Sequence, residues 1–569
     1  MCSFLAILVT MIVEMLKNSV GGALKKLSLP ESDVHLEHPA DLAYGDYSTN
    51  AAMVGARQAQ QNPKELAEKI VRVIARNKPD EVEKIEIGGS GFINFSLSRD
   101  FFANSIQEIL DKDKEWGKNI VLKGRKVMIE YTDPNPFKEM HIGHVMDNAV
   151  GESIARIIEF SGAEVKRANY QGDVGVHVAK AVYGIQKLGG KVTDIKMLGK
   201  AYVFGADAYE KNEKEKSAID VLNRKIYEHS DKEVNDIYDK GRSLSLAHFE
   251  IMYKKLDTHF DYYFFESQSG VFGKEVVEKG LKNKVFEQSE GAVVFRGEKY
   301  GLHTRVFLNS EGLPTYEAKE LGLARLKYDT YPYDISFVIT ASEIEGYFKV
   351  VLKAMEFVFP ELAKKTIHVS HGMLRLKTGK MSSRTGDVVT AEFLIDEVEK
   401  KVEEVMKDRD LENADEISLQ VAIGAIKYFV LKQAASKDIV FDFEKALSFE
   451  GDSGPYLQYA ATRAHSILEK ARERNIKEST HSRPKNVTTI ERLLYRFPEI
   501  VKRAQREYEP HYVTTYLTEL AGAFNSYYAQ ERIVDAGECA PYKIALTKAF
   551  YTTMKNGLWL LGIKAPEHM

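Results

Sequence analysis

Residues 126–173 predict a strand, a helix and a second strand, and this unit limits the folds open to the chain. KVMIEYT (126–132) is an apolar run typical of a buried strand. HVMDNAVGESIARIIEF (144–160) repeats apolar residues at helical spacing, and EVKRANYQGD (164–173) predicts a strand that ends in a turn. Such a strand–helix–strand unit is right-handed in nearly all proteins and pairs its strands in parallel. We therefore predict an α/β fold with a Rossmann-type, doubly wound parallel sheet.

The rest of the 569-residue chain predicts further domains, because single hydrophobic cores rarely grow beyond about 300 residues. Residues 1–110 alternate helical and strand patterns, so we expect an N-terminal α+β domain, followed by a charged linker at 111–119. The Rossmann-type domain is expected over 120–410, with a charged insertion at about 190–300. Residues 411–569 carry almost only helical patterns and predict an all-helical bundle.

Charge and cysteine content narrow the class of protein. The formal net charge is −4, so a nucleic-acid partner would need a local basic surface. With only Cys2 and Cys539, the chain has neither a disulfide framework nor a four-thiolate zinc site. The apolar stretch 4–13 lacks the charge and cleavage site of a signal peptide, and it predicts either a helix or a start codon placed too early. It is too short to span a bilayer, so we expect a cytoplasmic protein with no membrane partner.

The loop after the first strand carries two histidines, in PNPFKEMHIGH (134–144). His141 and His144 could be packing or surface residues, or a metal-binding pair, but no third metal ligand lies nearby in the sequence. Gly143 between them suggests close backbone approach to a ligand. Imidazole N–H groups at a helix N-terminus suit an anion, because the backbone amides there already favour negative charge. A nucleotide phosphate is the ligand that this pattern favours.

A second motif, LKTGKMSSRTGD (376–387), follows an apolar strand pattern and combines glycines, lysines, serines and an arginine. Alone it would be read as a solvated basic turn. A cationic, donor-rich loop is also what a transferring phosphoryl group and a departing pyrophosphate need.

HIGH (141–144) followed far downstream by KMSSR (380–384) resembles the paired signatures of the class I aminoacyl-tRNA synthetases. The resemblance implies the class I Rossmann fold and ATP, with Mg²⁺, as a substrate, with no structural metal. It implies that His141 and His144 stabilise the α-phosphoryl region and that Lys380 holds the leaving pyrophosphate. It further implies ATP contacts at Pro134, Asn135, Gly143, Met381, Ser382 and Ser383. No side-chain base is needed, since the attacking carboxylate is already ionised.

Within that class the chain resembles the arginyl-tRNA synthetase family over most of its length. The resemblance rests on PNPFKEMHIGH, GDVGVH (172–177), GLPTYEAKELGLA (312–324), EGDSGPYLQYAATR (450–463) and the ending LLGIKAPEHM, in this order. The cysteine-specific enzymes need several zinc thiolates, and the isoleucine, leucine and valine enzymes need a large editing domain that an insertion of this size cannot hold.

The family pattern implies that Glu130, Asn135, Tyr316 and Glu320 bind arginine. A guanidinium has five donors and a permanent charge, so its pocket needs carboxylates and planar acceptors. Glu320 stands where the family usually has aspartate, which keeps the charge and moves it by about one methylene. SEIEGYF (342–348) replaces the family's glutamine–histidine segment, so Glu343 is expected to supply another acceptor. Tyr316 could equally be a wall residue, and Glu130 an ordinary ion-pair or cap carboxylate.

The resemblance also implies contacts with tRNA in both flanking regions. Phe92 and Asn94, in GFINF, match the positions expected to read the D-loop. Residues 463–508 hold 12 Lys and Arg against 6 Asp and Glu, which gives the helical region a local basic surface. Tyr456, Tyr459 and Arg463 are expected to contact tRNA there, the tyrosines by stacking on unpaired bases. The alternative is a solvated helix face with core tyrosines.

Taken together, these features predict an arginine–tRNA ligase that works as a monomer. It would form arginyl-adenylate and pyrophosphate, then pass arginine to the terminal adenosine of its tRNA. The resemblance implies that bound tRNA is needed for activation, although both Lys138 and Lys380 are present, whereas some family members rely on one such lysine. Two alternatives are a nucleotidyltransferase of the same fold, which would be shorter, and a tRNA-binding relative without activity, which would not need the intact motifs.

Overall fold

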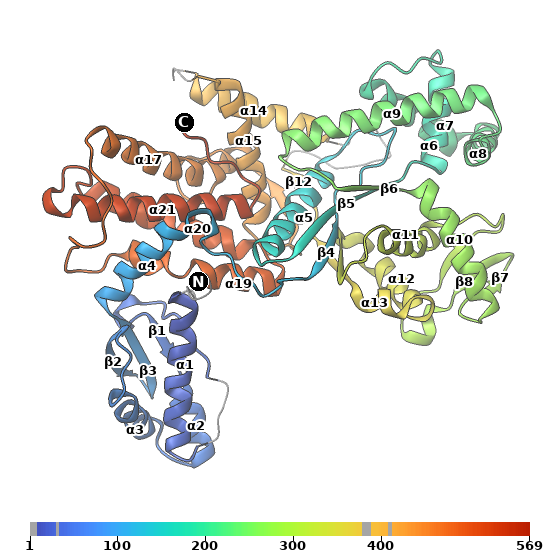
Figure 1. Cartoon of the computed structure of the whole chain (residues 1–569). Helices are drawn as coiled ribbons and strands as arrows, with labels where there is room; N and C mark the ends of the chain where they lie inside the picture. Colours follow the sequence, from blue (N-terminus) through green and yellow to red (C-terminus); the bar gives the residue numbers. More distant parts are fainter. Residues whose placement is uncertain (1–7, 30–33, 378–388, 408–411) are drawn as a thin grey trace.

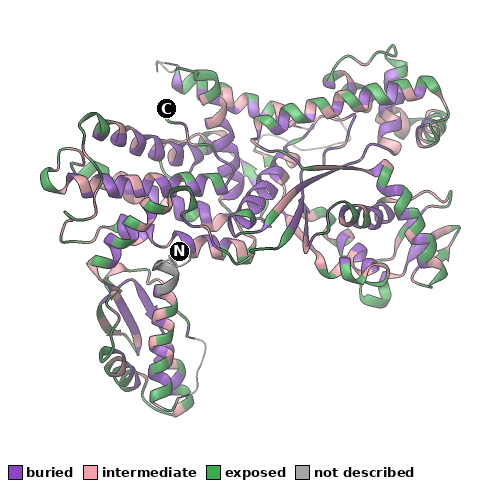
Figure 2. Ribbon diagram, viewed as in Figure 1, coloured by how far each residue is buried: buried purple, intermediate pink, exposed green. Residues whose placement is uncertain are grey.

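The computed structural model describes residues 8–29, 34–377, 389–407 and 412–569, and Figure 1 shows their arrangement. A helical region lies to the left of a central region built on one parallel sheet, and an N-terminal region lies below the helical region. Buried residues concentrate on the central strands and on the inner faces of the surrounding helices, as Figure 2 shows.

The central sheet has five strands in the order β11-β10-β4-β5-β6, all paired in parallel. The strands span Lys126–Glu130 (β4), Glu164–Gln171 (β5), Tyr262–Phe265 (β6), Ile335–Ala341 (β10) and Thr366–His371 (β11). The predicted doubly wound parallel sheet is therefore confirmed. Strand order runs in opposite directions on the two sides of β4, so the carboxyl ends of β4 and β10 flank the crevice where such sheets bind ligands.

Helices cover both faces of this sheet, so its strands are buried on both sides, as is usual for parallel sheets. Val127 and Ile129 of β4 belong to the apolar core that α5 (Ile142–Phe160) shares, whereas Met128 packs in a second cluster with Leu323. Leu323 lies on α11 (Tyr316–Thr330). The other helices of this half are α10 (Glu266–Lys282), α12 (Glu345–Val358) and α13 (Pro360–Lys365), with the 3-10 turn η4 (Ser342–Ile344).

Four helices between β5 and β6 form a module with an apolar core of its own. They are α6 (Val176–Lys187), α7 (Ile195–Lys211), α8 (Glu213–Glu228) and α9 (Lys232–Lys255). Strand β6 follows and pairs with β5, so the predicted insertion range of about 190–300 contains one strand of the central sheet. A small antiparallel sheet then precedes α11, with β7 (Glu287–Ser289), β8 (Ala292–Phe295), η3 (Gly297–Tyr300) and β9 (Arg305–Leu308).

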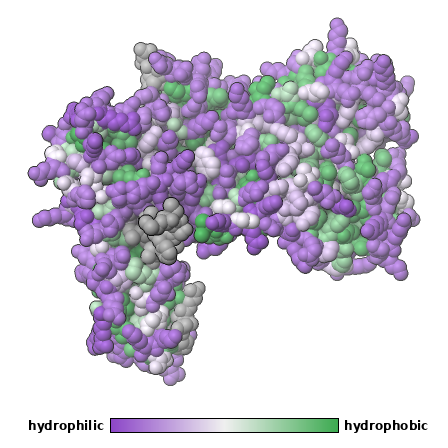
Figure 3. Space-filling view, viewed as in Figure 1, coloured by the Kyte–Doolittle hydropathy of each residue, from purple (hydrophilic) through white to green (hydrophobic). Residues whose placement is uncertain are grey.

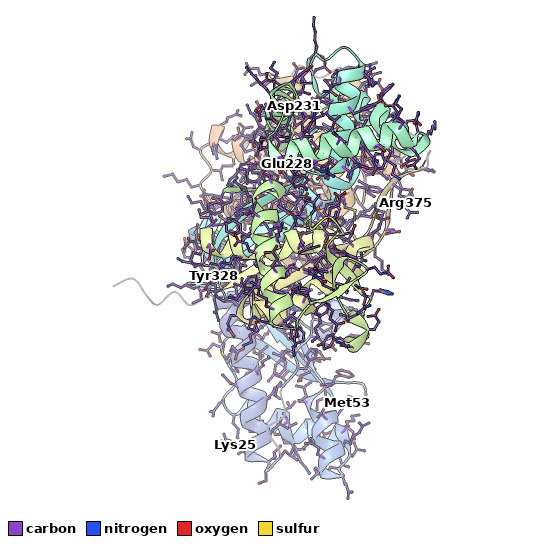
Figure 4. The ribbon with its side chains drawn as sticks, turned by 90° about the vertical axis from the view of Figure 1, so that its right-hand side faces the viewer. Lys25, Met53, Glu228, Asp231, Tyr328 and Arg375 are labelled. Carbon is purple, nitrogen blue, oxygen red and sulfur yellow. The ribbon has the colours of Figure 1, made fainter. Side chains whose placement is uncertain are left out.

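The N-terminal region packs helices on a three-stranded antiparallel sheet of order β1-β3-β2. Its elements are α1 (Leu8–Lys26), η1 (Leu42–Tyr44), β1 (Tyr47–Thr49), α2 (Ala51–Ala59), α3 (Pro63–Ala75), β2 (Val82–Gly88), β3 (Phe92–Leu97), α4 (Arg99–Lys112) and η2 (Asp113–Glu115). Gly89 and Gly91 join β2 to β3 with φ of 50° and 126°, so the predicted strand–turn–strand is present. Figure 4 marks this region with Lys25 and the opposite end, the α6–α9 module, with Asp231.

The helical region follows the helical pattern predicted for residues 411–569, with one additional strand, and its first helix, α14, lies before residue 411. Its helices are α14 (Ala391–Met406), α15 (Ala414–Leu431), α16 (Phe443–Ala446), α17 (Gly454–Glu473), α18 (Thr489–Leu494), α19 (Phe497–Glu507), α20 (His511–Gln530), η5 (Gly537–Cys539) and α21 (Ala540–Leu560). The addition is a short strand, β13 (Ile439–Phe441), which pairs in parallel with β12 (Leu374–Leu376). This pairing joins the helical region to the segment that precedes the second motif.

Among the described residues, no helix is both long and apolar enough to cross a membrane. The face of the molecule in Figure 3 is mostly hydrophilic. Hydrophobic side chains gather at its lower right, over α10 and the small antiparallel sheet, where Phe272, Tyr300 and Val306 are exposed.

Candidate active site

A cavity of about 570 Å³ opens at the carboxyl ends of the central strands. It is lined by Glu130, Thr132, Asp133, Asn135, His141, Gly143, His144, Asp147, Tyr170, Gly172, Glu266, Arg305, Tyr316, Glu320, Glu343, Tyr347, His371 and Leu374, among others. Two larger cavities lie where α9, α15 and the C-terminal segment meet, and Asp257 there is already paired with Arg156 and Lys564. The cavity at the sheet contains most of the residues that the sequence singled out.

The two histidines are held against each other at the start of α5. The backbone N–H of His141 donates to Nδ1 of His144 at 2.9 Å, and the two rings stack with their centroids 3.7 Å apart. A Cβ at Gly143 would lie 2.8 Å from the His141 ring, so only glycine fits between them. Because His144 Nδ1 accepts a hydrogen bond, the proton of the neutral His144 ring must sit on Nε2.

Both rings are neutral at physiological pH. Burial, reinforced by the Lys138 ammonium, lowers the pKa of His141 to about 4. Burial, with His141 and Lys138 nearby, lowers the pKa of His144 well below its usual value. Burial and Lys180 also lower the pKa of Lys138 to about 8, so that group stays largely charged at pH 7. The helix start therefore presents neutral N–H donors beside one ammonium, an arrangement that suits phosphate oxygens.

The loop that leads to the histidines holds unusual backbone conformations. Thr132, Asp133 and Phe137 have φ of 78°, 39° and 67°, a region that non-glycine residues rarely adopt. Tertiary hydrogen bonds fix the loop: Asn148 Nδ2 donates to the Thr132 hydroxyl at 3.1 Å, and the Phe137 N–H donates to the Ser245 hydroxyl at 2.9 Å. Backbone strain of this kind persists only where surrounding structure enforces it, and it clusters at functional sites.

The second motif lies outside the described residues from position 378 on, and these exclude Lys380, Met381, Ser382 and Ser383. Both of its flanks lie at the cavity. Leu374 lines the cavity before the motif, and after it the Val389 carbonyl accepts the Ile142 N–H at 3.2 Å. The Ala391 N–H then donates to the Met140 carbonyl at 2.8 Å. The chain thus enters and leaves this segment beside the two histidines.

Carboxylates dominate the end of the cavity nearest β5 and α11. Glu130 is buried and its Oε2 lies 2.7 Å from Nζ of Lys327, while Glu266 forms an ion pair with Lys319. Glu320, in contrast, forms no ion pair within the described part of the chain. Burial and the Glu130 carboxylate raise the pKa of Glu320 well above its usual value. Its carboxylate lacks the cation that would stabilise its charge.

Asp133 adds to this excess of negative charge. Its Oδ1 accepts the Tyr170 N–H at 2.6 Å, but burial and the Glu130 carboxylate raise its pKa well above the usual range. The cavity therefore combines several buried carboxylates with fewer cations, and it favours a positively charged ligand.

Most predicted substrate contacts meet in this cavity. Asn135 lies against Gly172, where any Cβ would collide with its side chain. Tyr316 is 59% exposed and forms part of the cavity rim, while Glu343 lines the wall. Pro134 is buried behind the loop and does not line the cavity.

The sequence analysis did not single out several lining residues. Glu266 follows β6, a four-residue strand inside the range assigned to the insertion, so no sheet pattern marked its position. Tyr170 ends β5, and Asp147 and His371 lie on α5 and at the end of β11. The only sequence signal that could have identified these residues is their position, either near the end of a strand or beside the histidine pair.

The predicted tRNA-contacting residues lie in two other regions, away from the central sheet (Figure 1). Asn94 on β3 is buried, and its Oδ1 accepts a hydrogen bond from Ser48 at 2.7 Å, while Phe92 beside it is half-buried. Tyr456, Tyr459 and Arg463 lie on α17 and are half-buried. The Arg463 guanidinium sits between the rings of Tyr459 and Tyr528, at 4.7 Å and 4.8 Å.

Comparison with known protein families matches three parts of the chain. Residues 105–443 match the family described as "tRNA synthetases class I (R), catalytic domain". Residues 457–569 match the "DALR anticodon binding domain", and residues 14–97 match the "Arginyl tRNA synthetase N terminal domain".

Full-length relatives point to the same family. The chain is 31% identical over 567 residues to the arginine–tRNA ligase of Halothermothrix orenii, covering 98% of this chain and 99% of the relative. It is 32% identical over 569 residues to that of Limosilactobacillus reuteri, covering 97% and 100%. The structure resembles the arginyl-tRNA synthetase of Thermus thermophilus with a TM-score of 0.79 at 25% identity, covering 98% of this chain and 100% of the other.

Proposed function

This chain belongs to the class I arginyl-tRNA synthetases, and we propose that the cavity at the sheet is where its arginine and ATP react. The enzyme is an arginine–tRNA ligase. Its overall reaction consumes ATP and joins arginine to the 3′-terminal adenosine of tRNA. What the cavity must provide is a place for a guanidinium, a place for phosphates, and a path between them.

The observation that carries the arginine assignment is the half-buried Glu320 carboxylate, which has no ion-pair partner among the described residues. Glu130 and Glu266 lie in the same cavity, but Lys327 and Lys319 already neutralise their charges. A guanidinium supplies the positive charge and planar donors that Glu320 needs, and Asn135, Tyr316 and Glu343 lie on the surrounding wall. Glu130 then contributes as a fixed acceptor rather than as the main counter-charge.

The ATP phosphates are assigned to the start of α5. The neutral rings of His141 and His144 can donate N–H groups there, and the helix N-terminus favours negative charge. Asn135 and Gly143 border the same space. Lys380, Met381, Ser382 and Ser383 are proposed to approach from the second motif, whose flanks lie beside the histidines. Mg²⁺ arrives as part of the MgATP substrate.

These positions account for the first half-reaction. The arginine carboxylate is already ionised and attacks the α-phosphorus, so no side chain needs to remove a proton. Negative charge grows on the phosphate oxygens as the bond to pyrophosphate breaks, and the histidine N–H groups, with the nearby Lys138 ammonium, are proposed to stabilise it. Because both imidazole rings are neutral, they can donate N–H hydrogen bonds without adding two positive charges next to the Lys138 ammonium.

The flanking regions are proposed to bind tRNA. The basic helical region is assigned to the anticodon arm, with Tyr456, Tyr459 and Arg463 as contacts, and the N-terminal region to the tRNA corner. Phe92 remains a candidate base contact, whereas Asn94 acts through its hydrogen bond to Ser48, which orders β1 and β3. The domain limits 1–110, 120–410 and 411–569, the need for tRNA in activation, a monomeric state and a cytoplasmic location also stay predictions.

The test is a crystal structure of the enzyme with a non-hydrolysable arginyl-adenylate analogue. We expect the guanidinium within hydrogen-bond distance of Glu320 and the phosphate-like linker beside His141 and His144. The matched lysyl analogue should leave Glu320 without a bidentate partner and bind far more weakly. An arginyl analogue bound in another cavity, or bound here with its guanidinium away from Glu320, would refute the assignment.

A further inference from the structure

Two polar atoms at one end of the cavity are buried and have no hydrogen-bond partner among the described residues. They are Oδ1 of Asp147 and Nε2 of His371. The other carboxylate oxygen of Asp147, Oδ2, lies 3.9 Å from His371 Nε2, beyond hydrogen-bond distance. Both residues line the cavity. Buried polar groups are almost always hydrogen-bonded, so these two atoms are available to bind a polar ligand atom.

The surroundings fix which hydrogen bonds the pair can make. His371 ends β11 and is 2% exposed, and its Nδ1 lies 2.7 Å from the Gly372 carbonyl. A carbonyl only accepts, so Nδ1 carries a proton and Nε2 is the atom left for a ligand. Despite burial, the Asp147 carboxylate and the Gly372 carbonyl raise the pKa of His371, which favours a proton on Nε2 as well.

A hydroxyl group can bridge the two side chains. Its oxygen can accept from His371 Nε2–H and its proton can go to the Asp147 carboxylate, because an oxygen about 2.8 Å from each partner fits the 3.9 Å between Nε2 and Oδ2. A phosphate or carboxylate would be repelled by Asp147, and a guanidinium has no acceptor for His371. The pair therefore selects a neutral group that both donates and accepts.

The position on α5 indicates which hydroxyl this is. Asp147 follows His144 by three residues on the same helix, so the two side chains lie on one face about 5 Å apart along the axis. The proposed function places the α-phosphate at His141 and His144, and the ribose of ATP is joined directly to that phosphate. On this basis we propose that Asp147 and His371 together bind a ribose hydroxyl of ATP and of the adenylate.

The terminal ribose of tRNA also carries hydroxyl groups that could bind this pair. The layout of the cavity favours the ribose of ATP. His371, Gly372, Met373 and Leu374 line the end of the cavity on the β11 side, whereas the carboxylates assigned to arginine lie toward β5 and α11. With the α-phosphate between these two ends, the nucleoside of ATP must occupy the β11 end in the first half-reaction.

The experiment compares ATP with 2′-deoxy-ATP and 3′-deoxy-ATP in arginine- and tRNA-dependent pyrophosphate exchange. The wild-type enzyme should use one of the deoxy analogues roughly tenfold to a hundredfold less well in kcat/KM, the range of a hydrogen bond to a charged group. In Asp147→Asn and His371→Gln the ratio of kcat/KM for ATP to kcat/KM for that analogue should fall toward one, because activity with ATP drops and activity with the analogue does not. His511→Gln, which alters a histidine–carboxylate pair in the helical region, should keep the wild-type ratio.

Equal losses with ATP and both analogues would show a merely structural role and would overturn the proposal, as would a wild-type enzyme that does not discriminate. If Asp147→Asn and His371→Gln left arginine-dependent exchange with ATP unchanged and slowed only the transfer of arginine to intact tRNA, the pair would belong to the tRNA ribose and the assignment to ATP would be rejected. If the wild-type enzyme showed no arginine-dependent exchange with ATP itself, the proposed function would fail first. The wild-type comparison needs no variant, so a misfolded substitution cannot hide the answer.

Discussion

Replacing Glu320 by glutamine should weaken arginine binding and at the same time stabilise the free enzyme. In the structure the Glu320 carboxylate is half-buried near Glu130, and its own charge has no ion-pair partner among the described residues. Arginine would supply that partner. Removing one member of a buried ion pair costs about 3–5 kcal/mol. At about 1.4 kcal/mol per factor of ten, Glu320→Gln should raise the KM for arginine roughly 10²- to 10³-fold.

The stability effect has the opposite sign, because burial and the Glu130 carboxylate disfavour the charged form of Glu320 in the folded enzyme. Burial and Glu130 raise its folded-state pKa well above the value in the unfolded chain, outweighing the attraction of Lys327. Between those two pKa values the folded state binds more protons, so the group makes stability fall as pH rises. The Glu320→Gln variant lacks this titrating group and so does not lose that stability as pH rises. Its free energy of unfolding should exceed that of the wild type at pH 7 to 8.

Pyrophosphate exchange at varied arginine concentration and urea unfolding at pH 5 and pH 8 measure the two effects. Glu320→Asp, which keeps the charge, should recover most of the arginine affinity. Asp329→Asn, at the exposed end of the same helix and paired with Arg325, should change neither quantity. An unchanged KM for arginine in Glu320→Gln, or a loss of stability at pH 8, would refute the assignment of Glu320 as the unpaired counter-charge.

Three further predictions concern other parts of the molecule. His144→Ala should lower kcat for pyrophosphate exchange by about 10²- to 10³-fold with little change in the KM for arginine, as expected for a donor used in the transition state; a purely raised KM would contradict this. Lys427 is buried, with Nζ donating to the Leu256 and Gly562 carbonyls, and burial lowers its pKa to about 7, far below that of the unfolded chain. The unfolded state therefore binds more protons above pH 7, and urea unfolding should show wild-type stability rising by about 2–3 kcal/mol from pH 7 to 9 relative to Lys427→Met; parallel curves would refute it. Arg463→Ala should raise the KM for tRNA in aminoacylation and leave the KM for arginine unchanged, and the reverse pattern would remove Arg463 from the tRNA surface.

The central fold could be predicted because its signals are local. The apolar run of β4, the helical spacing of α5 and the strand after it are each readable within a few residues. Their connection then determines where the two histidines lie. The position of the cavity follows from the same reasoning, since ligands bind at the carboxyl ends of such strands.

Contacts between distant segments could not be predicted. Nothing near Glu130 in the sequence indicates that Lys327, on α11, forms an ion pair with it. Strand β6 was not recognised because its four aromatic residues follow a long charged helical segment, and Glu266 was missed with it. The burial of Asn94 against Ser48 likewise depends on the pairing of β1 with β3.

The central claim is that this cavity activates arginine. It is tested most directly by ATP–pyrophosphate exchange with each of the twenty amino acids, with and without total tRNA. We predict exchange with arginine only, and only when tRNA is present. Exchange with arginine in the absence of tRNA would remove the proposed coupling and keep the pocket. Exchange driven by another amino acid would contradict the assignment of Glu130, Asn135, Tyr316 and Glu320 to a guanidinium.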